Sequence, residues 1–198
     1  MDSVPREVRF HEPGSYRHIT ARGNDRHALF RDDDDRWAFL GALGDVTRSF
    51  GWRCLGWCLM TTHYHLLVQE QAKPLSSGMH LLHSRYVRQF NRRHGHRGHV
   101  FGGRYHVATI VDDAHLLLAL RYVARNPVEA GLCARPESWP WSSYGQLVGA
   151  RPPMSFLSRA HALSLFDPRP ERAVELARRF VEPVPGTLVP GTGVSPGV

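Results

Sequence analysis

Lysine is nearly absent from this sequence, and cysteines and long apolar runs are also scarce. Lys73 is the only lysine among 198 residues. The three cysteines are too few and odd in number for a disulfide framework, and their spacing is not that of a zinc site. No apolar run is long enough to cross a bilayer, and the N-terminus lacks the pattern of a signal peptide. These absences predict a protein of the reducing cytoplasm.

Arginine therefore carries most of the positive charge, which amounts to a net +7 at pH 7. The planar guanidinium group suits phosphates and stacked bases better than the ammonium of lysine. A basic balance favours a nucleic-acid ligand but does not establish one, and a solvated basic loop is the alternative. We expect phosphate contacts from the densest basic cluster and from arginines near predicted strands and helices. These candidates are Arg17, Arg22, Arg92, Arg93, Arg97, Arg104 and Arg125.

Alternating and helical hydrophobic spacing predict an α+β domain. Strands are expected at residues 16–22, 52–60, 63–69 and within 100–111, the middle two forming a hairpin. Cys54 and Cys58 should then share one strand face. Helices are expected from the acidic run 32–35 to Gly51, from Pro74 onward, and from 114 to about 125, where Asn126-Pro127 should end the helix. We expect a ferredoxin- or RRM-like antiparallel sheet with helices packed on one face.

The composition changes after about residue 150, which predicts three parts. Residues 1–150 form the main domain, and residues 151–182 form a helical extension with a short helix at 170–181. Residues 183–198 are rich in proline and glycine and carry no charge, which is typical of a disordered tail.

A pair of histidines stands on the strand predicted at residues 63–69. Side chains at positions i and i+2 of a strand point to the same face, so His63 and His65 can bind one cation together. Tyr64 points to the opposite face, where we expect it in packing. The pattern is short, and two partly exposed strand histidines without a function are the alternative.

A later helix offers a tyrosine and an amide on one face, at Tyr122 and Asn126. The amide oxygen is a suitable third ligand for a hard divalent ion. Two imidazoles and one amide oxygen leave positions open for phosphate and water, which suits Mg²⁺ or Mn²⁺ acting on a phosphodiester. A core tyrosine and a C-cap asparagine are the alternatives.

Six segments occur in an order that makes them specific together. They are YRHITARGN at 16–24, WCLMTTHYHLLV at 57–68, YVRQFNRRH at 86–94, GHVFGGRY at 98–105, YVARNPVEAGL at 122–132 and WPWSSY at 139–144. The chain resembles, over residues 15 to about 150, the single-tyrosine HUH transposases with their IS200-like domain, and most of all the REP-associated tyrosine transposases.

The resemblance implies a metal-dependent endonuclease and strand transferase acting on single-stranded DNA through a 5′-phosphotyrosine. His63 and His65 match the metal-binding histidines, Asn126 the third ligand and Tyr122 the nucleophile. Hairpins of palindromic repeats are the implied partners, bound by a monomer or homodimer. The sequence departs from the family pattern at Tyr64, where a bulky hydrophobic residue is usual.

Two other interpretations remain. The histidine pair followed by Glu70 and Gly78 approaches a cupin metal motif, although Gly78 lies one residue too far along and cupins are all-β. The stronger alternative is a domesticated protein that binds repetitive DNA without cutting it.

Overall fold

A four-stranded antiparallel sheet lies at the centre of the protein, in a computed structural model that describes residues 12–71 and 73–182. The strands run in the order β2-β3-β1-β4. They are β1 (Tyr16–Arg22), β2 (Arg53–Leu59), β3 (His63–Gln69) and β4 (His106–Ile110). The helices are α1 (Asp33–Phe50), α2 (Leu75–His94), α3 (Asp113–Glu129), α4 (Tyr144–Leu147), α5 (Arg159–Ser164) and α6 (Pro170–Val181). The succession β1-α1-β2-β3-α2-β4 is ferredoxin-like, which confirms the predicted class.

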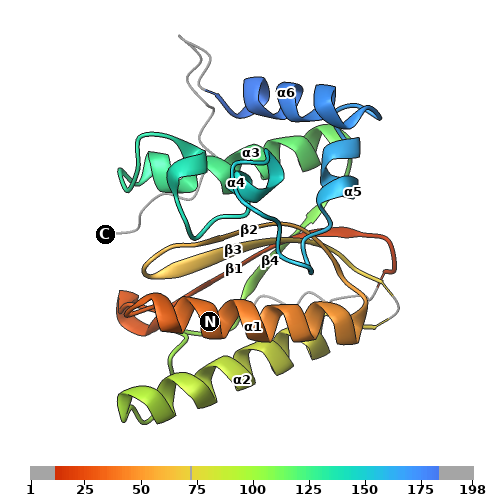
Figure 1. The fold of residues 1–198 in the computed structure, drawn as a ribbon. Helices are drawn as coiled ribbons and strands as arrows, with labels where there is room; N and C mark the ends of the chain where they lie inside the picture. Colours follow the sequence, from red (N-terminus) through yellow and green to blue (C-terminus); the bar gives the residue numbers. More distant parts are fainter. Residues whose placement is uncertain (1–11, 72, 183–198) are drawn as a thin grey trace, which may run out of the picture.

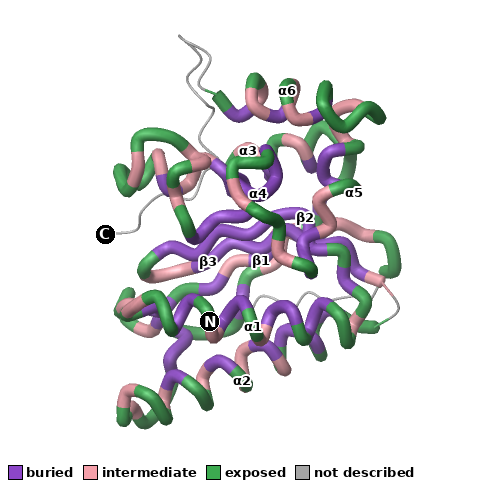
Figure 2. The backbone as a smooth tube through the Cα atoms, in the orientation of Figure 1, coloured by how far each residue is buried: buried purple, intermediate pink, exposed green. Residues whose placement is uncertain are grey.

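Helices cover both faces of this sheet, not one as predicted. Helices α1 and α2 lie against one face, and α3 with α4, α5 and α6 lies on the other (Figure 1). The reason is that β2 and β3 are buried at nearly every position, as Figure 2 shows. A strand with apolar side chains on both faces requires cover on both.

Each face of the sheet has its own apolar core. The core against α1 and α2 includes Ile19, Tyr64 and Tyr86. The core on the opposite face joins Leu67 of β3 and Leu120 of α3 to Ala177 of α6. The segment 151–182 therefore packs into the same core as α3, and its predicted helix at 170–181 is confirmed.

A bulge in β2 corrects the prediction for the cysteines. The register with β3 shifts between Cys54 and Gly56, so that an extra residue reverses the alternation of side chains. Cys54 consequently packs in the core beside α1 and α2, whereas Cys58 packs against Val123 of α3. Both thiols are free.

Helix α3 extends past the proline that was expected to end it. Asp112 caps its start by accepting a hydrogen bond from the backbone N–H of His115. Pro127 lies inside the helix, which runs on to Glu129. Because Pro127 is buried and falls in the last turn, few helical hydrogen bonds follow it, and packing outweighs the conformational cost.

The cupin interpretation is wrong, because this mixed fold is not a cupin barrel and its residues have other roles. Glu70 forms an ion pair of 2.6 Å with Arg17. Gly78 allows α2 to approach the ring of Trp52, where any Cβ would clash. The tail 183–198 lies outside the described residues. Within the described ranges, no helix is long and apolar enough to cross a membrane.

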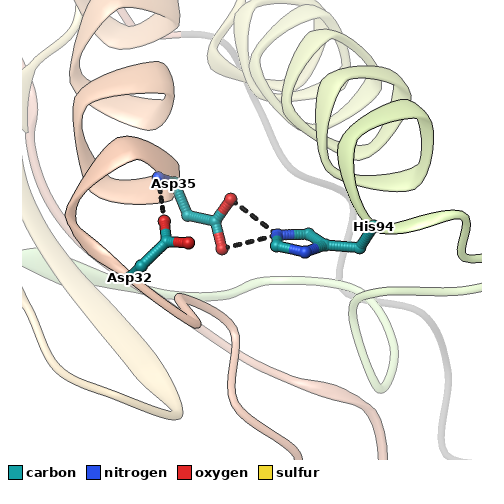
Figure 3. Close-up of side chains that lie close together, drawn as sticks. All are labelled: Asp32, Asp35 and His94. Atoms are coloured by element: carbon teal, nitrogen blue, oxygen red, sulfur yellow. Dashed lines mark hydrogen bonds and ion pairs between the residues drawn. The ribbon is translucent and has the colours of Figure 1, made fainter.

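Carboxylates at the start of α1 hold the end of α2, as Figure 3 shows in part. Asp32 caps α1 by accepting a hydrogen bond from the backbone N–H of Asp35, and the helix begins at the acidic run as predicted. The buried carboxylate of Asp35 accepts a hydrogen bond from His94 at 2.9 Å and pairs with Arg93 at 2.7 Å. Arg93 also pairs with Asp32 and with the exposed Asp34.

Replacing the buried carboxylate should destabilise the fold far more than replacing the exposed one. Asp35→Ala removes the acceptor of His94 and of the backbone N–H of Arg31, and one of the three carboxylates that pair with Arg93. We expect a loss of about 3 kcal/mol in the free energy of unfolding. Asp34→Ala, the matched control, removes an exposed pair and should cost less than about 1 kcal/mol. Urea denaturation measures both; equal losses would contradict this account of the junction.

Candidate active site

The alternation of β3 places two histidines side by side on the face covered by α3. Cys58 and Thr20 are the strand partners of His65 on either side, so His65 is on an internal strand. His65 is buried, and His63, at the start of the strand, is half-buried. Their ring centroids are 5.1 Å apart with nearly perpendicular planes.

Helix α3 brings its tyrosine and asparagine onto this pair. The Tyr122 ring lies edge-on to His65, with 5.3 Å between the ring centroids. The Asn126 side chain lies close enough to His63 to raise the pKa of that imidazole. Tyr122 keeps 39% of its surface exposed, so its ring remains accessible from solvent. The structure thus brings together the four residues that the sequence predicted for the reaction centre.

The two histidines are suited to bind a cation. Burial lowers the pKa of His65 well below its usual value, with further lowering by His18, His63 and Arg22. Burial and Arg22 also lower the pKa of His63, against the opposing effect of Asn126. Both imidazoles are therefore neutral at neutral pH, the form that binds metals.

One ring nitrogen in this group has no partner among the described residues. Nε2 of His65 is buried and makes no hydrogen bond. A buried polar atom without a partner is unfavourable and calls for an explanation. The donor set of two imidazole nitrogens and one amide oxygen fits a divalent ion, which would give Nε2 its missing partner.

His18 is a member of this site that the sequence analysis did not select. Its ring stacks on His65 and meets Tyr122 edge-on, with centroids 5.3 and 5.8 Å away. Burial, aided by His106 and His115, lowers the pKa of His18 to about 4. The available signal was its position on the strand at 16–22, from which a histidine would face α3 if that strand paired with 63–69.

Some of the predicted DNA-binding arginines gather near the His63 end of the sheet. Arg22, at the end of β1, is exposed and is the strand partner of His63. The backbone N–H of Gly102 donates to the carbonyl of Arg22, which ties the loop of residues 95–105 to this end. Arg97 and Arg104 of that loop are exposed. We call Arg22, Arg97 and Arg104 the basic rim.

Other predicted arginines already have partners within the protein. Arg17 is buried against Glu70 on the α2 side of the sheet, and Arg93 pairs with three carboxylates of α1. Arg125 donates to the carbonyl of Val181 at the end of α6. Arg92 is exposed near the end of α2. A role for these residues in DNA binding stays a prediction.

A second group of side chains is close enough together for one metal ion. Asp32, Asp35 and His94 offer ligand atoms within 4.8 Å of one another (Figure 3). The guanidinium of Arg93 pairs with both carboxylates, and its fixed positive charge disfavours the binding of a metal ion there. We therefore assign the group to the junction between α1 and α2.

The solved structures that are similar to this chain include two transposases. A REP-associated tyrosine transposase bound to a REP hairpin aligns with a TM-score of 0.64 and 18% identity, covering 77% of this chain and 90% of that one. A candidate transposase from Deinococcus radiodurans aligns with a TM-score of 0.42 and 16% identity, covering 64% and 97%. No curated protein sequence matches the chain.

The sequence model of the family described as "Transposase IS200 like" matches residues 13–126, which include His63, His65, Tyr122 and Asn126. The match spans more than half of the chain. It agrees with the fold shared with the REP-associated enzyme. The chain belongs to the IS200-like transposase family.

Proposed function

We propose that this transposase cuts and rejoins single-stranded DNA at hairpin-flanked repeats, with Tyr122 as the nucleophile. The observation that carries the proposal is the meeting of α3 and β3: Tyr122 lies against His65, and Asn126 against His63. The cytoplasm, where DNA is accessible, stays the predicted compartment.

A divalent cation, Mg²⁺ or Mn²⁺, is the proposed cofactor, held by His63, His65 and Asn126. The unpartnered Nε2 of His65 and the neutral state of both imidazoles support this assignment. When bound, such an ion supplies Lewis acidity to the scissile phosphate.

Tyr122 would attack the phosphorus in line with the departing 3′ oxygen. The tyrosine Oη–P bond forms as the P–O3′ bond breaks, giving a 5′-phosphotyrosine and a free 3′-OH. The phenol proton leaves to solvent and the 3′ oxygen takes one up, so the proton count is unchanged. Because the new bond is again a phosphodiester, another 3′-OH can reverse the attack without ATP. The edge-on contacts of Tyr122 with two imidazoles favour a fixed ring orientation.

The basic rim is the proposed contact for the DNA backbone beside the scissile phosphate. Arg22 is the strand partner of His63, and the loop that carries the exposed Arg97 and Arg104 bonds to the backbone of Arg22. Arginine on an exposed loop suits phosphate contacts that carry no sequence information. The REP hairpin bound by the structural relative supports a hairpin as the ligand here.

We infer that one chain builds the whole site. Tyr122 and the histidine pair already meet within a single chain, so the geometry needs no second copy. Arg121 and Arg125 of α3 donate to the carbonyls of Glu182 and Val181 at the end of α6, so an exchange of α3 alone between chains would break these bonds. A monomer with the tyrosine acting in cis is therefore favoured over a homodimer acting in trans.

Tyr122→Phe should abolish a covalent protein–DNA adduct. Hairpin oligonucleotides with randomised single-stranded flanks are labelled at the 3′ end, because the 5′-phosphotyrosine retains the segment 3′ of the cut. With Mn²⁺, wild type should shift the label on a denaturing gel, and EDTA should prevent the shift. Tyr16→Phe is the matched control, because Tyr16 bonds His161 at the opposite end of the sheet.

The alternative of a non-catalytic repeat-binding protein predicts a different result. Wild type would then retard the hairpin on a native gel and form no adduct under any metal condition. An adduct that persists in Tyr122→Phe would instead show that another residue is the nucleophile.

Mixing two inactive variants distinguishes cis from trans assembly. His63→Ala retains Tyr122 but lacks a proposed metal ligand, and Tyr122→Phe retains the ligands. A site built within one chain predicts that the mixture stays inactive in the adduct assay. Recovery of adduct on mixing, with both proteins folded, would show that the tyrosine of one copy serves the histidines of another.

Removing two members of the basic rim should reduce the salt dependence of hairpin binding. In Arg97→Ala/Arg104→Ala, the slope of log K against log salt should become shallower by about 1 for each lost phosphate contact. Arg172→Ala, which changes an exposed arginine in the first turn of α6 that pairs with Asp167, is the control. Equal slopes in all three proteins would place the DNA elsewhere.

A further inference from the structure

His18 contacts both the proposed nucleophile and a proposed metal ligand, but the reaction described above gives it no part beyond orienting the Tyr122 ring. It lies on β1, and the antiparallel register pairs Thr20 with His65 and His18 with Leu67. His18 and His65 are therefore diagonal neighbours on the face beneath α3. Their rings are stacked with 20° between the planes, and Nε2 of His18 lies 3.1 Å from Nδ1 of His65.

The surroundings decide which of these two nitrogens carries the shared proton. A neutral imidazole donates from one nitrogen and accepts at the other. If His18 were the donor, the proton of His65 would sit on its Nε2, which is buried and has no hydrogen-bond partner. A buried N–H without an acceptor is unfavourable. If His65 donates from Nδ1, its Nε2 keeps a lone pair, which is what a cation binds.

We propose that His18 is a positioning residue that accepts the Nδ1 proton of His65 and thereby holds the Nε2 lone pair of His65 ready for the metal. The inference rests on the metal site proposed above and deepens it. A hydrogen bond to the second ring nitrogen of a ligating histidine fixes both the tautomer and the orientation of the ring. Carboxylates and backbone carbonyls usually accept this bond; here the acceptor is another imidazole.

The two proposed histidine ligands then depend on different supports. His63 shares a hydrogen bond with Thr62 and lies beside Asn126, at the loop end of β3. His65 lies on an internal strand and has His18 as its only hydrogen-bond partner among the described side chains. Tyr122 lies edge-on to both His18 and His65, so both rings also contact the proposed nucleophile. Loss of His18 should therefore affect His65 selectively and leave His63 in place.

The tautomer of His65 tests the proposal without metal or DNA. Two-bond ¹H–¹⁵N correlation spectra of the full-length ¹⁵N-labelled protein, kept metal-free with a chelator at neutral pH, distinguish the two neutral forms. His65 is assigned by loss of its signals in His65→Gln. We expect the Nδ1–H form in wild type. The Nε2–H form would overturn the proposal, whether or not the protein cleaves DNA.

Metal affinity provides the second readout. Titration of Mn²⁺, followed by electron paramagnetic resonance, should show weaker binding by about 10–100-fold in His18→Phe, which keeps an aromatic ring but has no acceptor. His18→Gln places an amide oxygen near the position of Nε2, and it should restore most of the affinity. His161→Phe is the control, because His161 bonds Tyr16 and not the site.

The outcomes separate this inference from the proposed function. Affinity lost in His63→Ala but unchanged in folded His18→Phe would overturn the role of His18 and leave the metal site intact. Equal loss in the Phe and Gln variants would mean that ring packing, not hydrogen-bond acceptance, supports His65, and would also overturn it. Wild type that binds no Mn²⁺ would overturn both the metal site and this inference.

Discussion

The alternation of side chains along β3 is the constraint on which the rest of the site depends. Tyr64 is fully buried between the sheet and α1, and its hydroxyl shares a hydrogen bond of 2.6 Å with His83 of α2. Because side chains alternate along a strand, burial of Tyr64 in one core places His63 and His65 on the other face of the sheet. A slip of one residue would exchange the two sets, placing imidazoles in an apolar core. The apolar core under α1 and α2 thus determines where the histidines stand.

The position of Tyr122 depends equally on the contacts that hold α3 against the rest of the protein. Asp112 fixes its first turn, and Leu120 packs in a core that also contains Ala177 of α6. Near its other end, Arg121 and Arg125 donate to the final carbonyls of α6, where positive charge also complements the helix dipole. The boundary drawn at residue 150 reflects a change of composition, but the core continues across it. Segment 151–182 is thereby part of what holds the tyrosine over the histidines.

The sequence predicted those features that depend on local spacing. An i, i+2 histidine pair and an i, i+4 tyrosine–asparagine pair are properties of one strand and one helix, and both are present. Features that depend on pairing between distant segments were missed. Whether helices cover one face or two depends on packing between distant segments. Arg93 likewise meets carboxylates at the start of α1 that lie 58 to 61 residues away along the chain. His18 belongs to the same class, because nothing within residues 16–22 indicates which strand will lie beside it. The bulge at Cys54 and the continuation of α3 through Pro127 are cases in which packing overrode a local rule.

Stability alone does not account for His65 on the face of the sheet that α3 covers. His83, on the opposite side of the sheet, is half-buried, and the hydroxyl of Tyr64 is its partner. His65 has one nitrogen bonded to His18 and the other buried without a partner. An apolar side chain at this position would bury comparable surface without an unpaired polar atom, and would be favoured on energetic grounds. The ring that carries this unpaired nitrogen contacts Tyr122, the accessible tyrosine of α3. A cation bound there together with a phosphate would offset the energetic cost of the unpaired nitrogen. A local energetic cost of this kind is expected at a reaction centre where a side chain is positioned for a ligand that arrives from solvent.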